Sequence, residues 1–391
     1  MQSCTRSSSR RLPPPGLPFP TPHGTALVVS NAPETISSQS PISGLGYGTL
    51  YKGSVQIVAD LAQVATIRFY MWHVNATPVP LDFAILLQRV DGGPAVTLSP
   101  IRRQIRVDET NDLSIPGICL AKSQLFKTLD PVSGSLLVGA SEVLAWSDTV
   151  ASSRVLGVVY EFDLPLGMSA TLQVRTVASQ TSYFGTPVDN PIQERDPLES
   201  ETHVRGWWPR NYIVLPANTL PFDVSRFSAG TTIIECSVCE RNGPELDVSQ
   251  GFGHQPPDIH GTANGDIGCY GADLTYRFLV ENTNDQYWEK AFVYVRTRNN
   301  TGPPGKYWGA ARITSPVLYN GFGVPVLYYY PPQHTNHPNF VSLVQVGELL
   351  IPPGGPLNLD VAVANGGAAP LPVNLLVSRE VIASIPAQEP P

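Results

Sequence analysis

Residues 69–90 read FYMWHVNATPVPLDFAILLQRV, and this stretch decides the predicted fold. An apolar run ends at the turn-forming residues 75–78 (NATP) and a second apolar run follows, which is the pattern of a strand, a turn and a returning strand. The pattern recurs at residues 276–298, YRFLVENTNDQYWEKAFVYVRTR, where Asn282 aligns with Asn75. The recurrence predicts an internal duplication.

A second pair of segments supports the same prediction. Residues 154–176 (RVLGVVYEFDLPLGMSATLQVRT) align with residues 341–364 (VSLVQVGELLIPPGGPLNLDVAVA), with Pro165 on Pro352. Both matches occur in the same order along the chain, and the repeated unit is far longer than the ~20–50 residues of a solenoid repeat. We therefore expect each repeat to be a whole domain.

The composition favours strands over helices. Charged residues make up 15% of the 391 residues, below the roughly 25% usual for soluble proteins, and 39 Pro and 33 Gly interrupt the chain. No apolar pattern of helical period is sustained over three turns. We predict an all-β protein with little helix, built from two β-sandwich domains, jelly-roll or Ig-like, related by duplication. The predicted boundaries are a Pro-rich N-terminal arm at 1–24, a first domain at 25–178, a linker at 179–203, a second domain at 204–385 and a tail at 386–391.

The charge and hydropathy patterns exclude two classes of partner. The net charge is −7 and Lys and Arg are not clustered over any long stretch, so we expect no nucleic-acid surface. No run of 18 apolar residues occurs, so we expect no membrane span. Residues 1–24 contain no apolar core of the kind an intact signal peptide carries.

The second half of the chain carries a set of turn and strand motifs. GDIGCYG at 265–271 precedes the repeated strand, and PPGG at 352–355 and GGAAPLPV at 366–373 follow near the end. This outline resembles a group of uncharacterised bacterial secreted or surface proteins with paired β-sandwich domains. The resemblance covers most of residues 260–380 and, more faintly, residues 40–178. It implies a structural or adhesive role at a surface and supplies no catalytic residues.

Cysteines and histidines are the first candidates for chemistry. Cys236 and Cys239 form a CxxC pair that could bind a metal or act in redox chemistry, but the chain has no second CxxC. We expect instead a disulfide from Cys269 to one of the pair, or buried thiols. Two loop segments carry side chains that could ligate copper or zinc, although we predict no cofactor: His254, Asp258 and His260, and His334 and His337.

Motifs for enzymatic catalysis are missing from the sequence. There is no Gly-x-Ser-x-Gly element of the kind that carries a nucleophilic serine in α/β-hydrolases. The glycine-rich segment GLGYG at 44–48 is not followed by a helix and cannot place phosphates on a helix N-terminus. We therefore predict that the protein is not an enzyme.

Runs of aromatic residues indicate surfaces beyond the two cores. Neighbouring residues of a strand point to opposite faces of the sheet, so a run of rings cannot all enter one core. Some rings must face solvent, a carbohydrate or another subunit, or else be buried between the domains. The rings expected to be exposed are Trp207, Trp208, Tyr328, Tyr329 and Tyr330. Asn75 and Asn299 fit the Asn-x-Thr pattern of glycosylation, although Asn75 also suits a turn.

These patterns together predict a non-enzymatic structural subunit of an extracellular or cell-surface assembly, either a filament or a lattice. Copies of the chain would form a homo-oligomer or polymer through strand edges and an extended N-terminal arm, with Thr25, Leu27 and Val29 in the exchanged strand. Two alternatives remain open. One is a virion capsid or fibre protein, and the other is a carbohydrate- or metal-binding surface module.

Overall fold

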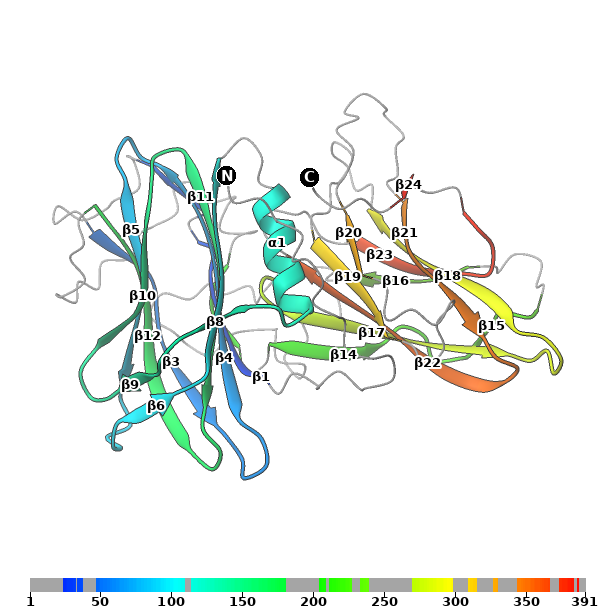
Figure 1. The fold of residues 1–391 in the computed structure, drawn as a ribbon, viewed down its shortest axis with the longest axis horizontal. Helices are drawn as coiled ribbons and strands as arrows, with labels where there is room; N and C mark the ends of the chain where they lie inside the picture. The colour runs from blue at the N-terminus through cyan, green and yellow to red at the C-terminus, as the bar shows by residue number, and fades with distance from the viewer. Residues whose placement is uncertain are drawn as a thin grey trace.

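The computed structural model describes residues 24–32, 34–37, 47–109, 114–180, 204–208, 211–226, 233–238, 269–297, 309–314, 326–329, 343–365, 373–382 and 385–386. These residues form two β-sandwich domains with one helix packed between them (Figure 1). The predicted fold class is confirmed. Among the described residues no helix is long and apolar enough to cross a membrane.

The first domain pairs a seven-stranded sheet with a four-stranded sheet. The larger sheet has the order β13 (Arg205–Trp208), β1 (Gly24–Ser30), β4 (Ala65–Ala76), β11 (Arg154–Leu164), β7 (Ile101–Glu109) and β8 (Asp130–Val132), with β2 (Thr35–Ser37) also on β4. The smaller sheet has the order β10 (Val143–Val150), β5 (Leu81–Arg89), β12 (Ser169–Ser179) and β3 (Tyr47–Val58). A short ribbon joins β6 (Val96–Leu98) to β9 (Leu136–Val138), and the helix α1 spans Ser114–Leu125.

The second domain repeats this arrangement. One sheet has the order β14 (Tyr212–Pro216), β17 (Asp273–Asn282), β22 (Gly354–Asn365), β19 (Gly309–Thr314) and β20 (Val326–Tyr329), with β15 (Phe222–Asp223) also on β17. The other has the order β16 (Ile233–Val238), β23 (Val373–Ser378), β18 (Glu289–Thr297), β21 (Leu343–Ile351) and β24 (Ile385–Pro386).

The two domains share ten strands in the same order along the chain and in the same places in the sheets. β4 corresponds to β17: each has a parallel neighbour (β1 or β14), a short parallel strand (β2 or β15) and an antiparallel neighbour (β11 or β22). In the second sheets, β3–β12–β5–β10 corresponds to β16–β23–β18–β21. The first sequence match, between residues 69–90 and 276–298, therefore aligns equivalent hairpins.

The second sequence match aligns strands that are not equivalent, because it is displaced by one strand along the chain. It places the β11–β12 hairpin on the β21–β22 hairpin, whereas the hydrogen-bonded neighbours make β11 equivalent to β22 and β12 equivalent to β23. A proline-glycine turn followed by an alternating strand is a local requirement of any tight hairpin, so it recurs at turns that are not related by the duplication. Pro165 and Pro352 therefore do not correspond.

The equivalent turns are built on one asparagine each. The Asn75 side-chain amide donates to the carbonyl oxygens of Val79 and Val150, at 2.9 Å each. The Asn282 amide donates to Tyr287 and Ile351, at 2.8 and 3.0 Å. Each asparagine thus joins its own turn to the end of a neighbouring strand. That strand is β10 in the first domain and its equivalent, β21, in the second.

The boundary predicted between the domains needs correction. We expected residues from 204 onward to open the second domain, but β13 pairs antiparallel with β1 in the first domain, with Leu27 opposite Trp208. The second domain begins its sheets at β14. The chain therefore returns to complete the first sheet after the predicted linker.

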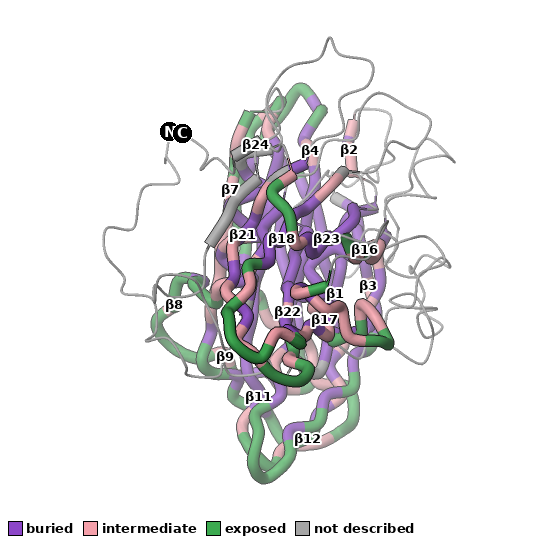
Figure 2. Tube along the Cα trace, turned by 90° about the vertical axis from the view of Figure 1, so that its right-hand side faces the viewer, coloured by how far each residue is buried: buried purple, intermediate pink, exposed green. Residues whose placement is uncertain are grey.

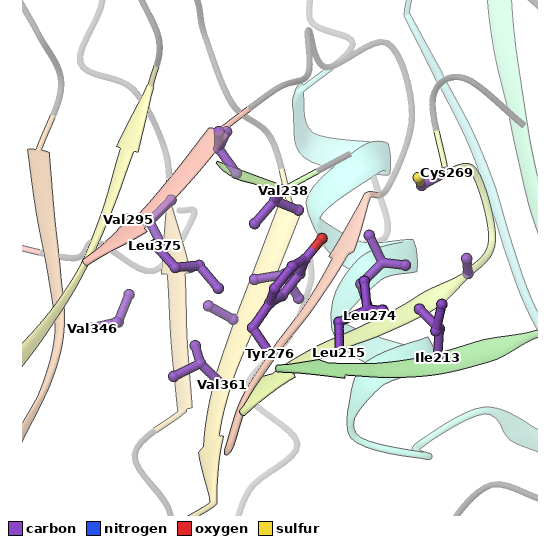
Figure 3. Packing of buried hydrophobic residues seen from close by; sticks show 14 of the residues in the cluster. Ile213, Leu215, Val238, Cys269, Leu274, Tyr276, Val295, Val346, Val361 and Leu375 are labelled. Carbon is purple, nitrogen blue, oxygen red and sulfur yellow. The ribbon is translucent and has the colours of Figure 1, made fainter. Parts of the chain in front are cut away.

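Apolar side chains from facing sheets fill each core. In the second domain, Tyr276 and Val361 from one sheet lie opposite Val295, Val346 and Leu375 from the other (Figure 3). In the first domain β4 is buried on both faces, because alternate residues enter different clusters. One face of β4 lines the first domain's own core and the other is covered by the second domain.

Candidate functional site

The junction between the domains is an extensively buried feature that the two sandwiches do not require by themselves. Tyr70 and Trp72 of β4 belong to the same buried apolar cluster as the second domain's core residues. The ring of Tyr70 stacks on that of Tyr270, with centroids 5.8 Å apart. The apolar core is therefore continuous across the junction.

Helix α1 packs between the two domains (Figure 1). Leu120 faces the first domain, where Gly157 leaves room for it: a Cβ at Gly157 would lie 2.5 Å from the Leu120 side chain. Ala121 and Leu125 pack against alanines of β19 and β22 in the second domain. Small residues on both sides allow the helix to lie close to each sheet.

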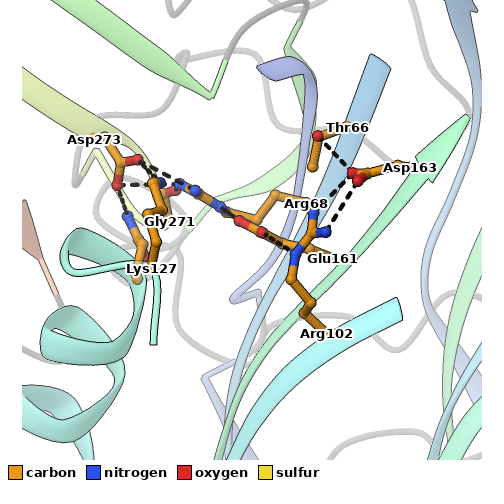
Figure 4. Close-up of polar contacts among 9 residues, drawn as sticks. Thr66, Arg68, Arg102, Lys127, Glu161, Asp163, Gly271 and Asp273 are labelled. Atoms are coloured by element: carbon orange, nitrogen blue, oxygen red, sulfur yellow. Dashed lines mark hydrogen bonds and ion pairs between the residues drawn. The ribbon is translucent and has the colours of Figure 1, made fainter. Parts of the chain in front are cut away.

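A chain of buried charges crosses the junction (Figure 4). Arg68 on β4 donates from Nε to Glu161 of the first domain at 2.7 Å, and its other nitrogens reach the carbonyl of Gly271 at 2.8 Å and the carboxylate of Asp273 at 3.2 Å in the second domain. Lys127, which follows α1, donates to Asp273 at 2.5 Å. One guanidinium thus joins a carboxylate from each domain.

The network continues to the side of the first domain. Arg102 forms a bidentate pair with Asp163 at 2.8 and 2.9 Å and also contacts Glu161 at 3.3 Å. The Thr66 hydroxyl donates to Asp163 at 2.7 Å. Each buried carboxylate therefore has at least one cation and further donors, which is the condition for a stable buried ion network.

The carboxylates of Asp273 and Glu161 stay ionised. Burial alone would raise the pKa of Asp273, but Arg68 and Lys127 outweigh it and hold that pKa well below its ordinary value. Burial likewise opposes ionisation of Glu161, and Arg68, Lys127 and Arg102 together lower its pKa. Arg68, Glu161 and Asp273 are enclosed, whereas Arg102 and Lys127 are partly exposed at the edges of the network. The enclosed part of the network therefore fixes how the domains meet.

A serine–histidine contact lies inside the first domain. Ser30 Oγ is 3.1 Å from His73 Nε2 and 2.9 Å from the hydroxyl of Thr176. All three residues are fully buried, and the His73 ring stacks on Phe83. Catalysis by such a pair would require a substrate to reach the serine, and burial prevents that, so the contact satisfies buried polar groups.

One end of the first domain is apolar and exposed. The β3–β4 loop and the β11–β12 turn meet there, held by hydrogen bonds from Gly167 N to the Asp60 carbonyl and from Ala59 N to the Met168 carbonyl, at 2.8 Å each. Leu61 is 89% exposed and Leu166 52% exposed. We call this surface the apolar end, formed by Val58, Leu61, Val64, Val90 and Leu166. Figure 2 shows exposed tube at this end, where β11 meets β12.

The turn between β17 and β18 exposes two large aromatic rings. Tyr287 is 65% and Trp288 51% exposed, and Asp285 and Gln286 beside them are exposed too. The equivalent turn of the first domain contains no aromatic residue. The sequence reasoning missed this pair, although the alignment of Asn75 with Asn282 already showed that the second turn is longer and contains a Tyr-Trp pair.

The predicted assembly strand is not an edge. β1 lies between β13 and β4, and Leu27 and Val29 are fully buried in the cluster that crosses the junction. Thr25 belongs to the same internal strand. The sequence pattern showed that this segment forms a strand, but it could not show that β13 returns from beyond the linker to cover it.

Two other predictions of exposure are wrong among the described side chains. Trp208 is fully buried in the inter-domain cluster, and Trp207 is half-buried against the first domain's core. The two rings do point to opposite faces, but both faces of β13 are covered. Asn75 is fully buried with its amide nitrogen engaged, so it cannot accept a glycan.

The three described cysteines are divided between two states. Cys119 on α1 and Cys269 are each disulfide-bonded, whereas Cys236 carries a reduced thiol and is not the partner of Cys269. The described part of the chain contains no cluster of three or more His, Cys, Asp or Glu side chains that could hold a metal ion. The remaining predicted site residues lie outside the described residues: Cys239, His254, Asp258, His260, Asn299, Tyr330, His334 and His337, and the side chains of Tyr328 and Tyr329.

Comparison with known proteins adds little to this picture. No family model matches the chain, and no curated protein matches it. A solved structure, the N-terminal CBM22-1-CBM22-2 tandem domain from Paenibacillus barcinonensis Xyn10C, matches over 87% of this chain and 96% of that chain, at 8% identity and a TM-score of 0.15. A likeness at that level carries no argument about function.

Proposed function

We propose that this protein is a non-enzymatic structural subunit of an extracellular or cell-surface assembly, in which copies of the chain associate through the apolar end of the first domain. The observation that carries the proposal is the grouping of five exposed aliphatic side chains at that end. Contiguous exposed apolar surface is typical of sites where proteins associate. We also propose, as part of the same hypothesis, that the chain is related to bacterial surface proteins with paired β-sandwich domains.

The charges around the apolar end favour a second copy of the chain as the partner. Asp60 accepts hydrogen bonds from the backbone of its own loop, at 2.7 and 2.5 Å, and Arg89 pairs with Asp91. The chain as a whole carries a net charge of −7, so copies repel one another over most of their surface. At the apolar end Arg89 offsets Asp91 and leaves Asp60 as the one uncompensated charge of these three, so little charge repulsion opposes contact between two copies there.

The junction and the cysteines are consistent with such a role. A subunit of a filament or lattice has to hold its contact surfaces in a fixed relative orientation. The Arg68 network supports this role because it joins both domains into one unit. Disulfides persist in oxidising environments such as the cell exterior, and Cys119 and Cys269 are both disulfide-bonded. The extracellular location is inferred from this chemistry.

The test compares the wild-type chain with a double variant, Leu61→Asp with Leu166→Asp. Sedimentation velocity over a concentration series should show wild-type association that the double variant loses, and electron microscopy should show filaments or a lattice for the wild type alone. Leu220→Asp is the matched control, because Leu220 is also highly exposed but lies in the second domain. A wild type that stays monomeric at its highest soluble concentration overturns the proposal.

Two other results would also overturn it. If the double variant associates as the wild type does, the apolar end is not the contact. If the wild type binds phospholipid vesicles through Leu61 and Leu166 but does not associate in solution, the partner of this end is a lipid surface instead. Particles that enclose nucleic acid would support the virion alternative.

A further inference from the structure

The β17–β18 turn holds its aromatic residues in a defined backbone conformation. The Asn284 side-chain oxygen accepts hydrogen bonds from Gln286 N at 3.0 Å and Tyr287 N at 3.3 Å, and Asn282 donates to the Tyr287 carbonyl. Exposed Tyr and Trp side chains fixed on a rigid backbone lose little conformational entropy when they bind. The turn is therefore organised for binding before any partner arrives.

A second set of hydrogen bonds holds the start of the turn against the short strand β15. Asp223 on β15 accepts from the Thr283 hydroxyl at 2.5 Å and from the hydroxyl and amide of Ser225, and its carboxylate also pairs with Arg226 at 3.1 Å. Hydrogen bonds from Ser225 and Thr283 lower the pKa of Asp223 although its partial burial opposes this, so the support stays ionised at neutral pH. The start of the turn is thus anchored to the neighbouring strand.

The equivalent turn in the first domain shows that the aromatic residues are not needed to build the hairpin. There the Asn75 amide makes the same pair of hydrogen bonds, and residues 77–80 (TPVP) close the turn. The second domain keeps the asparagine and carries residues 283–288 (TNDQYW) instead. The additional exposed side chains are therefore available for another role.

The chemistry around Tyr287 and Trp288 selects the class of ligand. Exposed Asp285 and Gln286 supply hydrogen-bond donors and acceptors next to the two rings. The carboxylates near the turn are Asp223, Glu281, Asp285 and Glu289, whereas the cations Arg226 and Lys290 are each paired with a carboxylate, the latter with Glu348 at 2.5 Å. The resulting negative field disfavours anionic ligands.

We propose that the β17–β18 turn is a binding site for a neutral glycan. Tyr287 and Trp288 would pack against the apolar C–H faces of sugar rings, and Asp285 and Gln286 would exchange hydrogen bonds with hydroxyl groups. An aromatic surface beside carboxylate and amide groups matches the alternating apolar and hydroxylated faces of a neutral sugar. In Figure 1 the hairpin projects at the far end of the second domain, away from the first domain.

Affinity electrophoresis in gels containing soluble polysaccharides tests the proposal. Migration of the wild type should be retarded by at least one neutral polymer among hydroxyethylcellulose, galactomannan and β-glucan, and not by the anionic polymer alginate. Trp288→Ala and Tyr287→Ala should each weaken retardation roughly tenfold or more, since 1.4 kcal/mol of lost contact energy is a factor of ten. Val79→Ala, at the equivalent turn of the first domain, is the matched control and should migrate as the wild type.

Fluorescence provides an independent measurement. Of the described tryptophans, Trp72, Trp146 and Trp208 are buried and Trp207 is half-buried, so Trp288 should dominate the acrylamide-quenchable emission of that set. The retarding polysaccharide should protect this emission in the wild type. Trp288→Phe should keep binding, because an aromatic ring remains, but should lose the protected signal.

Failure of this inference is distinguishable from failure of the assembly proposal. The Leu61→Asp with Leu166→Asp variant should bind the polysaccharide as the wild type does, because the apolar end lies in the other domain. Absence of retardation by every neutral polymer overturns the glycan site. So does retardation that Trp288→Ala and Tyr287→Ala leave unchanged, or retardation by alginate alone.

Discussion

The two asparagine-based turns have the same framework and present different surfaces. Asn75 and Asn282 make equivalent hydrogen bonds to their own turn and to the adjoining strand end. The first turn then closes with Val79 between two prolines, and the second extends to exposed Tyr287 and Trp288. The difference shows that the buried amide determines where the hairpin ends, while residues beyond it are free to acquire a separate role.

The strands that lead into these turns differ in the same way. The outer face of β4 carries Arg68, which is buried against the second domain. The corresponding face of β17 carries Arg277, which pairs with Asp360 in a largely exposed position. Each strand thus carries an arginine paired with a carboxylate on the adjacent antiparallel strand, but Arg277 aligns with Tyr70 and not with Arg68. Only the Arg68 pair contributes to the junction.

The largest expected effect comes from breaking the buried arginine pair. Arg68→Met should destabilise the protein by about 3–5 kcal/mol, because Glu161 and Asp273 stay buried without the cation that they share. Arg277→Met should change stability by less than about 1 kcal/mol, since its ion pair is exposed to water. Denaturant unfolding of both variants measures the contrast, and equal losses would contradict the structural distinction.

An intermediate effect is expected from the two asparagines. Asn75→Ala and Asn282→Ala each remove the donor to one turn carbonyl and to one strand-end carbonyl, and should each cost about 1–3 kcal/mol. Thermal unfolding followed by circular dichroism measures both. Similar losses of stability would support equivalent roles for the two asparagines. A loss at only one position would show that the two turns share their hydrogen-bond geometry but that only one of them contributes to stability.

The smallest effect is expected from mild acid. The pKa values of Asp273 and Glu161 lie below their ordinary values of 3.8 and 4.5, so their stabilising contribution is complete above those values and is lost as the pH falls. Between pH 7 and pH 4 these two groups should cost about 1 kcal/mol, because the unfolded chain takes up protons first. Hydrogen exchange of α1 should accelerate over this range. Exchange that slows on acidification, after correction for its intrinsic pH dependence, would contradict the assignment.

Local patterns in the sequence were sufficient to predict the fold class and the duplicated hairpin. The run FYMW at residues 69–72 identified a strand, and the structure shows that this strand is buried on both faces. The asparagine of each turn was identifiable because turns favour that residue. These features depend on residues close together in the chain.

Features that depend on distant residues were not predictable in the same way. Nothing near Arg68 in the sequence indicates that Asp273 will pair with it, and nothing near β1 indicates that β13 will cover it. The proposed exchange through Leu27 and Val29 failed for this reason. Pairing with β13, which comes from beyond the predicted linker, makes an apparent edge strand internal, and only the three-dimensional contacts reveal it.

The pairing of β1 with β13 has a consequence for biosynthesis. During translation the first domain can form its sandwich from residues up to 179, but the edge of β1 stays open until residues 205–208 have left the ribosome. A nascent chain is therefore exposed to pairing with other nascent chains over that interval, since an open strand edge is a template for such pairing. The number of residues between β12 and β13 consequently sets how long the edge of β1 stays unpaired during synthesis.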